Sequence, residues 1–173
     1  MLNQAVLKGA IGGLTENQYL LGQKYYYGNG EDRNIELATS WYELAAKKGH
    51  ASASFMYAYI LLSGENGKIN VNRGTKYLKR ACHKNHSQSI LLLARNYYYG
   101  YGVKPSYKKA YKLWKRGTKM GCPEAEYYLG LCYMKGIHVS KNVLKAKKHL
   151  YNALDNGFDL AKITIKDLPR VAC

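Results

Sequence analysis

The sequence predicts an all-α fold, an α/α solenoid of about four helix-turn-helix repeats of 36 residues with a half-repeat cap at each end. Glycines, small residues and large residues each recur at this one spacing, and no insertion interrupts it. The three series are Gly28, Gly64, Gly100 and Gly136; Gly22, Ala58, Ala94 and Gly130; and Tyr25, Leu61, Tyr97 and Tyr133. A constant period of this length is typical of stacked repeats, which commonly offer a surface to another protein.

The first half of each repeat is predicted to be a helix, because apolar residues recur at steps of three and four, as from Ala125 to Tyr133. A glycine-centred turn then ends this helix, since glycine readily adopts a positive φ. In the second repeat we expect Asn66 to take the left-handed conformation, and His138 fits the fourth turn least well. The turns are Gly28-Asn29-Gly30, Gly64-Glu65-Asn66, Gly100-Tyr101-Gly102 and Gly136-Ile137-His138.

The second half of each repeat resumes as a helix. We expect these helices to run from Ile35 to Lys48, Gly74 to Lys84, Lys108 to Met120 and Leu144 to Asn156. Each is followed by a residue suited to a helix C-terminus, namely Gly49, Asn85, Gly121 or Gly157. Pro123 stands at the first turn of the next helix, where a missing N–H costs little. Small residues in mid-helix predict a close crossing of the two helices, because a bulky side chain would separate them.

The register of the repeats extends past both ends of this set, since Gly13 lies 36 residues before Gly49. Residues 2–12 are therefore predicted to be a lone second helix, and residues 159–168 a first helix that ends at Pro169. We see no linker or break in composition, so we expect a single domain over residues 1–173. Its predicted parts are a capping half-repeat (1–14), four repeats (15–50, 51–86, 87–122 and 123–158), and a C-terminal cap and tail (159–173).

A family resemblance rests on the residues of the first repeat. They are Gln18-Tyr19-Leu20-Leu21-Gly22, Tyr25, Gly28-Asn29-Gly30, Ala38, Trp41-Tyr42, Ala45-Ala46 and Gly49-His50. This pattern resembles the Sel1-like repeat, a relative of the tetratricopeptide repeat, over nearly the whole chain. The second repeat departs most, with Ala58 for the family's glycine and Tyr77 for its tryptophan. The resemblance implies a right-handed superhelix whose first helices line the concave face, and an adaptor role in signalling, secretion, host contact or toxin immunity.

The variable positions of the first helices would then form the partner-binding surface. They are apolar and aromatic with scattered Arg, Asn and Gln, and Tyr and Arg are enriched at the hot spots of interfaces. The alternative is that superhelical curvature buries part of these positions. The predicted partner-binding residues are Gln23, Tyr27, Tyr59, Arg95, Asn96, Tyr99, Tyr128 and Leu131.

The charge is strongly positive and uneven, with a formal net charge of +16. No acidic residue lies between Glu65 and Glu124, an interval that holds 14 lysines and arginines. Such a field speeds encounter with negative partners. An acidic protein, a nucleic acid or an anionic membrane would fit, but we find no nucleic-acid motif and no helix typical of membrane surfaces. The alternative is that the charge has no binding role, and that the lysine-rich second helices simply form a solvated outer face.

Catalytic and metal-binding patterns are missing from the sequence, so we expect no enzymatic activity, metal or cofactor. Cys82, His83 and His86 cluster but have no carboxylate nearby. Cys122 and Cys132 lie on one predicted helix, too far apart to be bridged. Scattered thiols, the lack of a signal-peptide pattern and the lack of a long apolar run together predict a cytoplasmic protein without membrane insertion, monomeric when unbound.

The leading hypothesis is a non-enzymatic protein–protein interaction module that binds an acidic partner protein in its concave face. An alternative is a cytoplasmic immunity protein that neutralises an antibacterial toxin or effector by direct binding. A further alternative is nucleic-acid binding through the basic middle repeats, which would be steeply salt-dependent.

Overall fold

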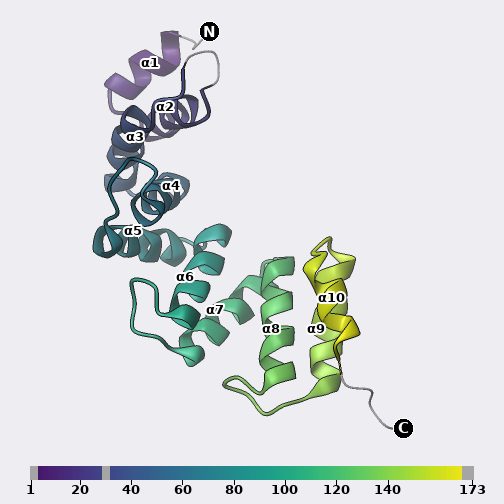
Figure 1. Cartoon of the computed structure of the whole chain (residues 1–173). Coiled ribbons are helices and arrows are strands. Elements are labelled where there is room, and N and C mark those ends of the chain that lie inside the picture. Colours follow the sequence, from purple (N-terminus) through teal and green to yellow (C-terminus); the bar gives the residue numbers. More distant parts are fainter. Residues whose placement is uncertain (1–3, 29–31, 169–173) are drawn as a thin grey trace. The chain divides into compact units, whose positions relative to one another are not determined.

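The computed structural model describes residues 4–28 and 32–168. Over these residues the chain forms ten α-helices and no strand (Figure 1). The first cap and the two helices of each repeat follow one another in chain order, as the period predicts. The helices are α1 (Gln4–Ile11), α2 (Thr15–Tyr27), α3 (Ile35–Lys47), α4 (Ala51–Ser63), α5 (Val71–His83), α6 (Ser87–Tyr99), α7 (Tyr107–Lys119), α8 (Pro123–Lys135), α9 (Val143–Asp155) and α10 (Leu160–Lys166).

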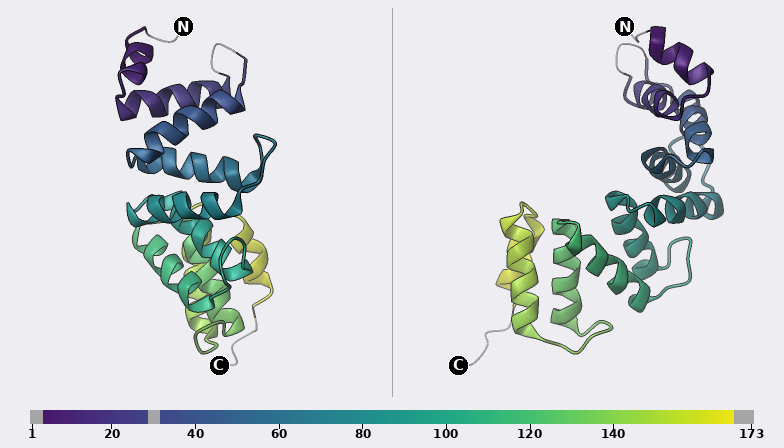
Figure 2. Two further views of the ribbon diagram at one scale, coloured as in Figure 1. Left: turned by 90° about the vertical axis from the view of Figure 1, so that its left-hand side faces the viewer. Right: turned by 180° about the vertical axis from the view of Figure 1, so that it is seen from behind.

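The chain divides into two compact units, which we call unit 1 (residues 1–89) and unit 2 (residues 90–173). In unit 1, α2 packs on α3 and α4 on α5, while α3 and α4 join the first pair to the second. In unit 2, α7 packs on α8, α8 on α9, and α9 on α10. Figure 2 shows the helices of each unit lying one after another in chain order. Each helix therefore buries its apolar face mainly against its neighbours in the sequence.

The second helices begin at capping side chains that the sequence analysis did not single out. Asn34, Asn70, Ser106 and Asn142 stand 36 residues apart, directly before α3, α5, α7 and α9. The side-chain oxygen of each accepts a hydrogen bond from the backbone N–H three residues later, at 2.9, 3.0, 3.3 and 2.8 Å. Because the first N–H groups of a helix have no partner within it, these caps set where each second helix starts.

The first helices end as the glycine series predicts. Gly28, Gly64 and Gly136 follow α2, α4 and α8 in the left-handed conformation, and each N–H donates to a carbonyl four residues earlier. His138 also takes a positive φ of 64°, so the least favoured turn has the expected shape.

The second repeat differs from the prediction in two ways. The other left-handed residue of its turn is Gly67, with φ of 77°, and not Asn66. Its second helix begins at Val71, three residues before the expected Gly74, because Asn70 caps it. Pro123 is the first residue of α8, as predicted, whereas the predicted stop at Pro169 lies outside the described residues.

The small residues of the first helices lie at close helix crossings. A Cβ added to Gly22 would lie 2.6 Å from Cδ1 of Tyr42, and one added to Gly130 would lie 2.7 Å from Cγ of Leu150. In the second repeat the position of Gly22 holds Ala58, and the glycine stands on the other helix instead. A Cβ on this residue, Gly74, would lie 2.8 Å from Cγ of Leu62. The crossing is kept although the helix that supplies the glycine changes.

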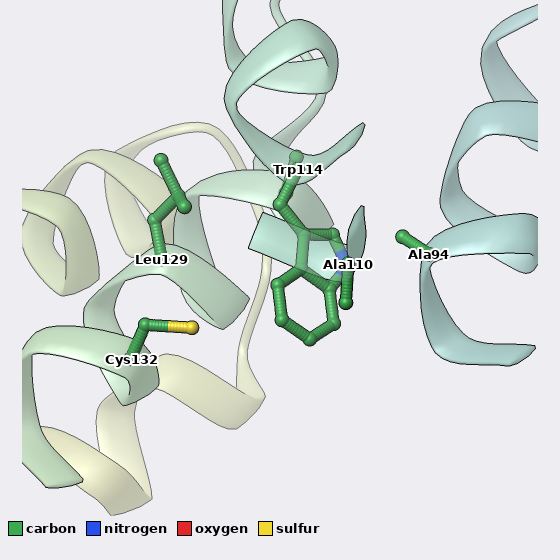
Figure 3. Packing of buried hydrophobic residues seen from close by; sticks show 6 residues of the cluster. Ala94, Ala110, Trp114, Leu129 and Cys132 are labelled. Atoms are coloured by element: carbon green, nitrogen blue, oxygen red, sulfur yellow. The ribbon is translucent and has the colours of Figure 1, made fainter. Parts of the chain in front are cut away.

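A tryptophan stands at the centre of the core of unit 2. Trp114 is 1% exposed and packs with Ala94, Ala110, Leu129 and Cys132 (Figure 3). Its ring stacks on Tyr128, with the ring centroids 4.8 Å apart and the planes 5° from parallel. The core of unit 1 is built around buried Tyr42, Tyr57, Leu21, Ile60 and Leu78. Small residues from one helix and large rings from the next thus fill each core.

Replacing Trp114 with alanine should lower the free energy of unfolding by about 3–5 kcal/mol, because it leaves a cavity in the core of unit 2. Tyr99→Ala is the matched control, since Tyr99 is 69% exposed and its loss should cost less than about 0.5 kcal/mol. Chemical denaturation followed by circular dichroism measures both. Equal losses in the two variants would contradict the assignment of core and surface.

Replacing Asn70 with alanine should destabilise the protein by about 1 kcal/mol, because the N–H of Arg73 loses its acceptor. Asn70→Asp keeps an acceptor and adds a negative charge at a helix N-terminus, so its stability should match that of the native protein. Urea denaturation of both variants checks this. The capping role would be wrong if aspartate and alanine were equally destabilising.

Candidate functional site

The first helices of the repeats place six of the eight predicted partner-binding residues around two hollows, one in each unit. Gln23, Tyr27 and Tyr59 line a groove in unit 1. The other hollow, a smaller pocket in unit 2, is lined by Tyr99, Tyr128 and Leu131 among others. We call these the unit 1 groove and the unit 2 pocket.

The unit 1 groove has a volume of about 450 Å³. It lies over α2 and α4 and reaches the start of α6, so three successive first helices contribute to it. Tyr27 is 59% exposed and Tyr59 38% exposed. The lining consists of Tyr19, Gln23, Tyr26, Tyr27, Ser52, Phe55, Met56, Tyr59, His86 and Gln88.

The rings of the groove are held in place by one another. The rings of Tyr26 and Tyr27 meet edge to face with their centroids 5.0 Å apart, and Phe55 stacks on His86 at the same centroid distance. Gln23 Nε2 donates a hydrogen bond to the hydroxyl of Tyr19 at 2.9 Å. Side chains that are fixed before a ligand arrives lose little conformational entropy when it binds. The groove is thus pre-organised for binding.

The groove is electrically neutral at physiological pH. No Lys, Arg, Asp or Glu is among the described residues that line it. Burial, and next the neighbouring His50, lowers the pKa of His86, which favours its uncharged form. Burial raises the pKa of Tyr19, and burial together with the hydrogen bond to Glu65 raises the pKa of Tyr26 to about 12. Both phenols therefore stay protonated. The single O–H of Tyr26 is engaged by the Glu65 carboxylate, whereas the hydroxyl of Tyr19 accepts from Gln23 and can still donate to a ligand.

The unit 2 pocket is smaller, with a volume of about 80 Å³. The stacked rings of Trp114 and Tyr128 form one wall, and Tyr98 meets Tyr99 edge to face with the centroids 4.8 Å apart. The exposed Lys135 also lines this pocket, so it combines aromatic surface with a cation. This combination suits a side chain or chain end that carries both apolar atoms and a negative charge.

Two predicted residues lie outside both linings. Arg95 is exposed, and its Nη1 lies 3.5 Å from Oε1 of Glu124, which partly neutralises its charge. Asn96 departs from the expectation, because it is only 4% exposed. Asn96 therefore lies beneath the surface. Its backbone carbonyl accepts hydrogen bonds from the N–H groups of Gly100 and Tyr101 at the end of α6.

The sequence analysis missed several residues of the groove, most clearly Tyr26, Phe55 and His86. A signal for Phe55 was present, since it lies 36 residues after Tyr19 and both rings line the groove. His86 stands 36 residues after His50, and the Nδ1 atoms of both accept a backbone N–H at a helix start. The position of Tyr26 holds Leu62 in the second repeat but Tyr98 in the third, and Tyr98 lines the unit 2 pocket.

The described part of the chain offers little basis for metal or thiol chemistry. Residues 4–28 and 32–168 contain no group of three or more His, Cys, Asp or Glu side chains that could hold a metal ion. In the same ranges no helix is long and apolar enough to cross a membrane. Burial raises the pKa of the Cys132 thiol to about 12, which makes it a poor nucleophile.

Comparison with known proteins identifies the repeats. The family model described as "Sel1 repeat" matches residues 18–50, 51–86, 87–122 and 123–158. In the solved structure of a Sel1 repeat protein from Oxalobacter formigenes, 63% of the chain aligns with 91% of this one, at 27% identity and a TM-score of 0.84. A protective antigen of uropathogenic Escherichia coli with the same fold aligns over 94% of this chain and 35% of its own, at 23% identity and a TM-score of 0.88.

Curated relatives are much longer than this chain. An uncharacterized protein of Neisseria meningitidis is 26% identical over 73% of this chain and 26% of its own length. Chitin synthase regulatory factor 1 of Schizosaccharomyces pombe is 27% identical over 85% of this chain and 32% of its own length. The chain thus spans about a quarter to a third of these relatives. These matches confirm the predicted α/α solenoid, and the chain belongs to the Sel1 repeat family, whose repeats mediate protein–protein interactions.

Proposed function

We propose that this chain is a non-enzymatic interaction module that binds a segment of an acidic partner protein along its first helices. The observation that carries the proposal is the unit 1 groove, where aromatic rings from consecutive repeats surround about 450 Å³. Tyrosine combines a large rigid contact area with a hydrogen-bonding hydroxyl, and it is enriched where interfaces derive most of their affinity. A protein segment with apolar side chains fits this lining.

The acidic character of the partner follows from charge. The formal net charge is +16, and such a field attracts negative surfaces over distances near the Debye length, about 8 Å at physiological salt. Lys135 in the unit 2 pocket supplies a cation beside an aromatic contact. Chitin synthase regulatory factors are, by their names, regulators of another protein, which supports a role through binding rather than through catalysis.

A second candidate, nucleic-acid binding, is favoured by one observation on α7. Lys108, Lys112, Lys115 and Lys119 are exposed and lie at steps of four, three and four residues, which places them along one face of the helix. None of them forms an ion pair with a described residue. A row of lysines can neutralise consecutive phosphates, and its affinity would fall steeply as salt rises.

Replacing both Tyr27 and Tyr59 with alanine should weaken partner binding by at least about tenfold, since each truncation of a hot spot costs more than about 1 kcal/mol. The thermal midpoint should stay unchanged, because both side chains are exposed. Tyr151→Ala is the matched control, since it removes an exposed tyrosine of α9 that lines neither hollow.

The partner for this measurement comes from affinity capture on the native chain at low and moderate salt, followed by mass spectrometry. An acidic protein that is retained at both salts, and lost in the tyrosine variant, supports the proposal. A toxin or effector among such proteins would identify the immunity form of this function. Nucleic acid that elutes with salt, and binds the tyrosine variant as well as the native chain, would support the α7 surface instead.

A further inference from the structure

A second cleft in unit 1 has the opposite chemistry to the groove. It has a volume of about 330 Å³ and lies where α3 and α5 end and α4 begins. The cleft and the unit 1 groove have no lining residue in common. The residues that line it are Ala46, Lys47, Gly49, Ser54, Arg80, His83 and Lys84. We call it the cationic cleft.

The charges of this cleft are poorly compensated. Two lysines, one arginine and one histidine line the cleft, and no carboxylate is among its described lining residues. Only Lys47 has a carboxylate partner, with Nζ 2.6 Å from Oε1 of Glu43. The other two arginines of unit 1 are each paired, Arg33 with Glu65 and Arg73 with Glu43. Arg80 instead lies over the ring of Tyr77, which orients its guanidinium.

Helix capping does not explain why these cations gather here. Lysines and arginines often serve the unpaired carbonyls at the end of a helix. At the end of α3, however, the carbonyls of Ala45 and Ala46 already accept hydrogen bonds from the N–H groups of His50 and Gly49. At the end of α5, the carbonyl of Ala81 accepts from Lys84 and His86. Arg80 and Lys84 have no carboxylate partner among the described residues, so their charged groups can contact a ligand, whereas Lys47 is paired with Glu43.

The backbone also leaves room for an ammonium group in the cleft. Lys84 Nζ lies 3.1 Å from the place where a Cβ on Gly49 would stand. Gly49 has a φ of 87°, which disfavours any side chain at this position. Lys84 therefore lies directly against the backbone that follows α3. Arg80 and His83 stand four and one residues before Lys84 at the end of α5, and all three side chains line the cleft.

We propose that the cationic cleft binds a doubly charged oxyanion of the phosphate type. A guanidinium can donate two parallel hydrogen bonds to such a group, and an ammonium and an imidazole can add a third and a fourth. This site is separate from the groove of the proposed function and does not depend on it. The phosphate would come either free from solution or on a phosphorylated side chain of another protein.

The first test is titration of the full chain with inorganic phosphate at constant ionic strength, followed by isothermal calorimetry and by the imidazole NMR signal of His83. We expect saturable binding. Arg80→Gln with Lys84→Gln should weaken it by at least about tenfold, since each change removes a charge-assisted hydrogen bond. The control is Lys162→Gln with Lys166→Gln on α10, two exposed lysines that line none of the three hollows. This variant removes the same charge and should change the affinity for phosphate by less than about twofold.

One further variant and one further ligand distinguish the possible results. Arg80→Lys keeps the charge but loses the paired donors, so it should bind phosphate with intermediate affinity. A phosphoserine tripeptide that binds more tightly than inorganic phosphate would assign the site to a phosphorylated side chain, and equal affinity would assign it to free phosphate. The proposal is overturned if binding is not saturable, or if the α10 control loses as much affinity as the cleft variant. Circular dichroism of each variant verifies that it is folded.

Discussion

Helices of this chain come together where one of them carries glycine or alanine, and a large side chain from the facing helix fills the space. Tyr42 does so against Gly22, and Leu150 against Gly130. The close approach fixes how near the two helices of a pair lie, and small residues stand at this position in every repeat, 36 residues apart. The remaining features follow from it, because it decides which residues of a first helix face the core and which face outward.

In unit 1 the 36-residue period brings aromatic side chains of successive repeats to one groove. Tyr19 and Phe55 occupy the same position in consecutive repeats, and both line the unit 1 groove. The repeat thus lines the unit 1 groove with residues that are 36 positions apart in the chain. Such surfaces suit extended partner segments better than small substrates.

In unit 1 the uncharged aromatic surface and the cluster of cationic side chains lie in different places. The groove is aromatic and uncharged, whereas the cationic cleft lies at the ends of α3 and α5. A cation inside the groove would have to lose its hydration among rings, and a cation on an exposed helix end keeps part of it. In unit 1 the positive charge that would attract an acidic partner therefore lies outside the groove, and part of it lies at the cleft.

The sequence by itself determined the fold class, the number of repeats and most helix ends, because these depend on local properties that recur with the period. Glycine turns, apolar spacing and Pro123 act within a few residues of chain. The sequence also indicated the side of the first helices that carries Tyr27, Tyr59 and Tyr99. Only the tertiary structure decided that Asn96 is buried, that His86 joins the groove, and that Arg80 and Lys84 share a cleft with Lys47. Burial and grouping depend on contacts between helices that are distant in the chain, and no local pattern specifies them.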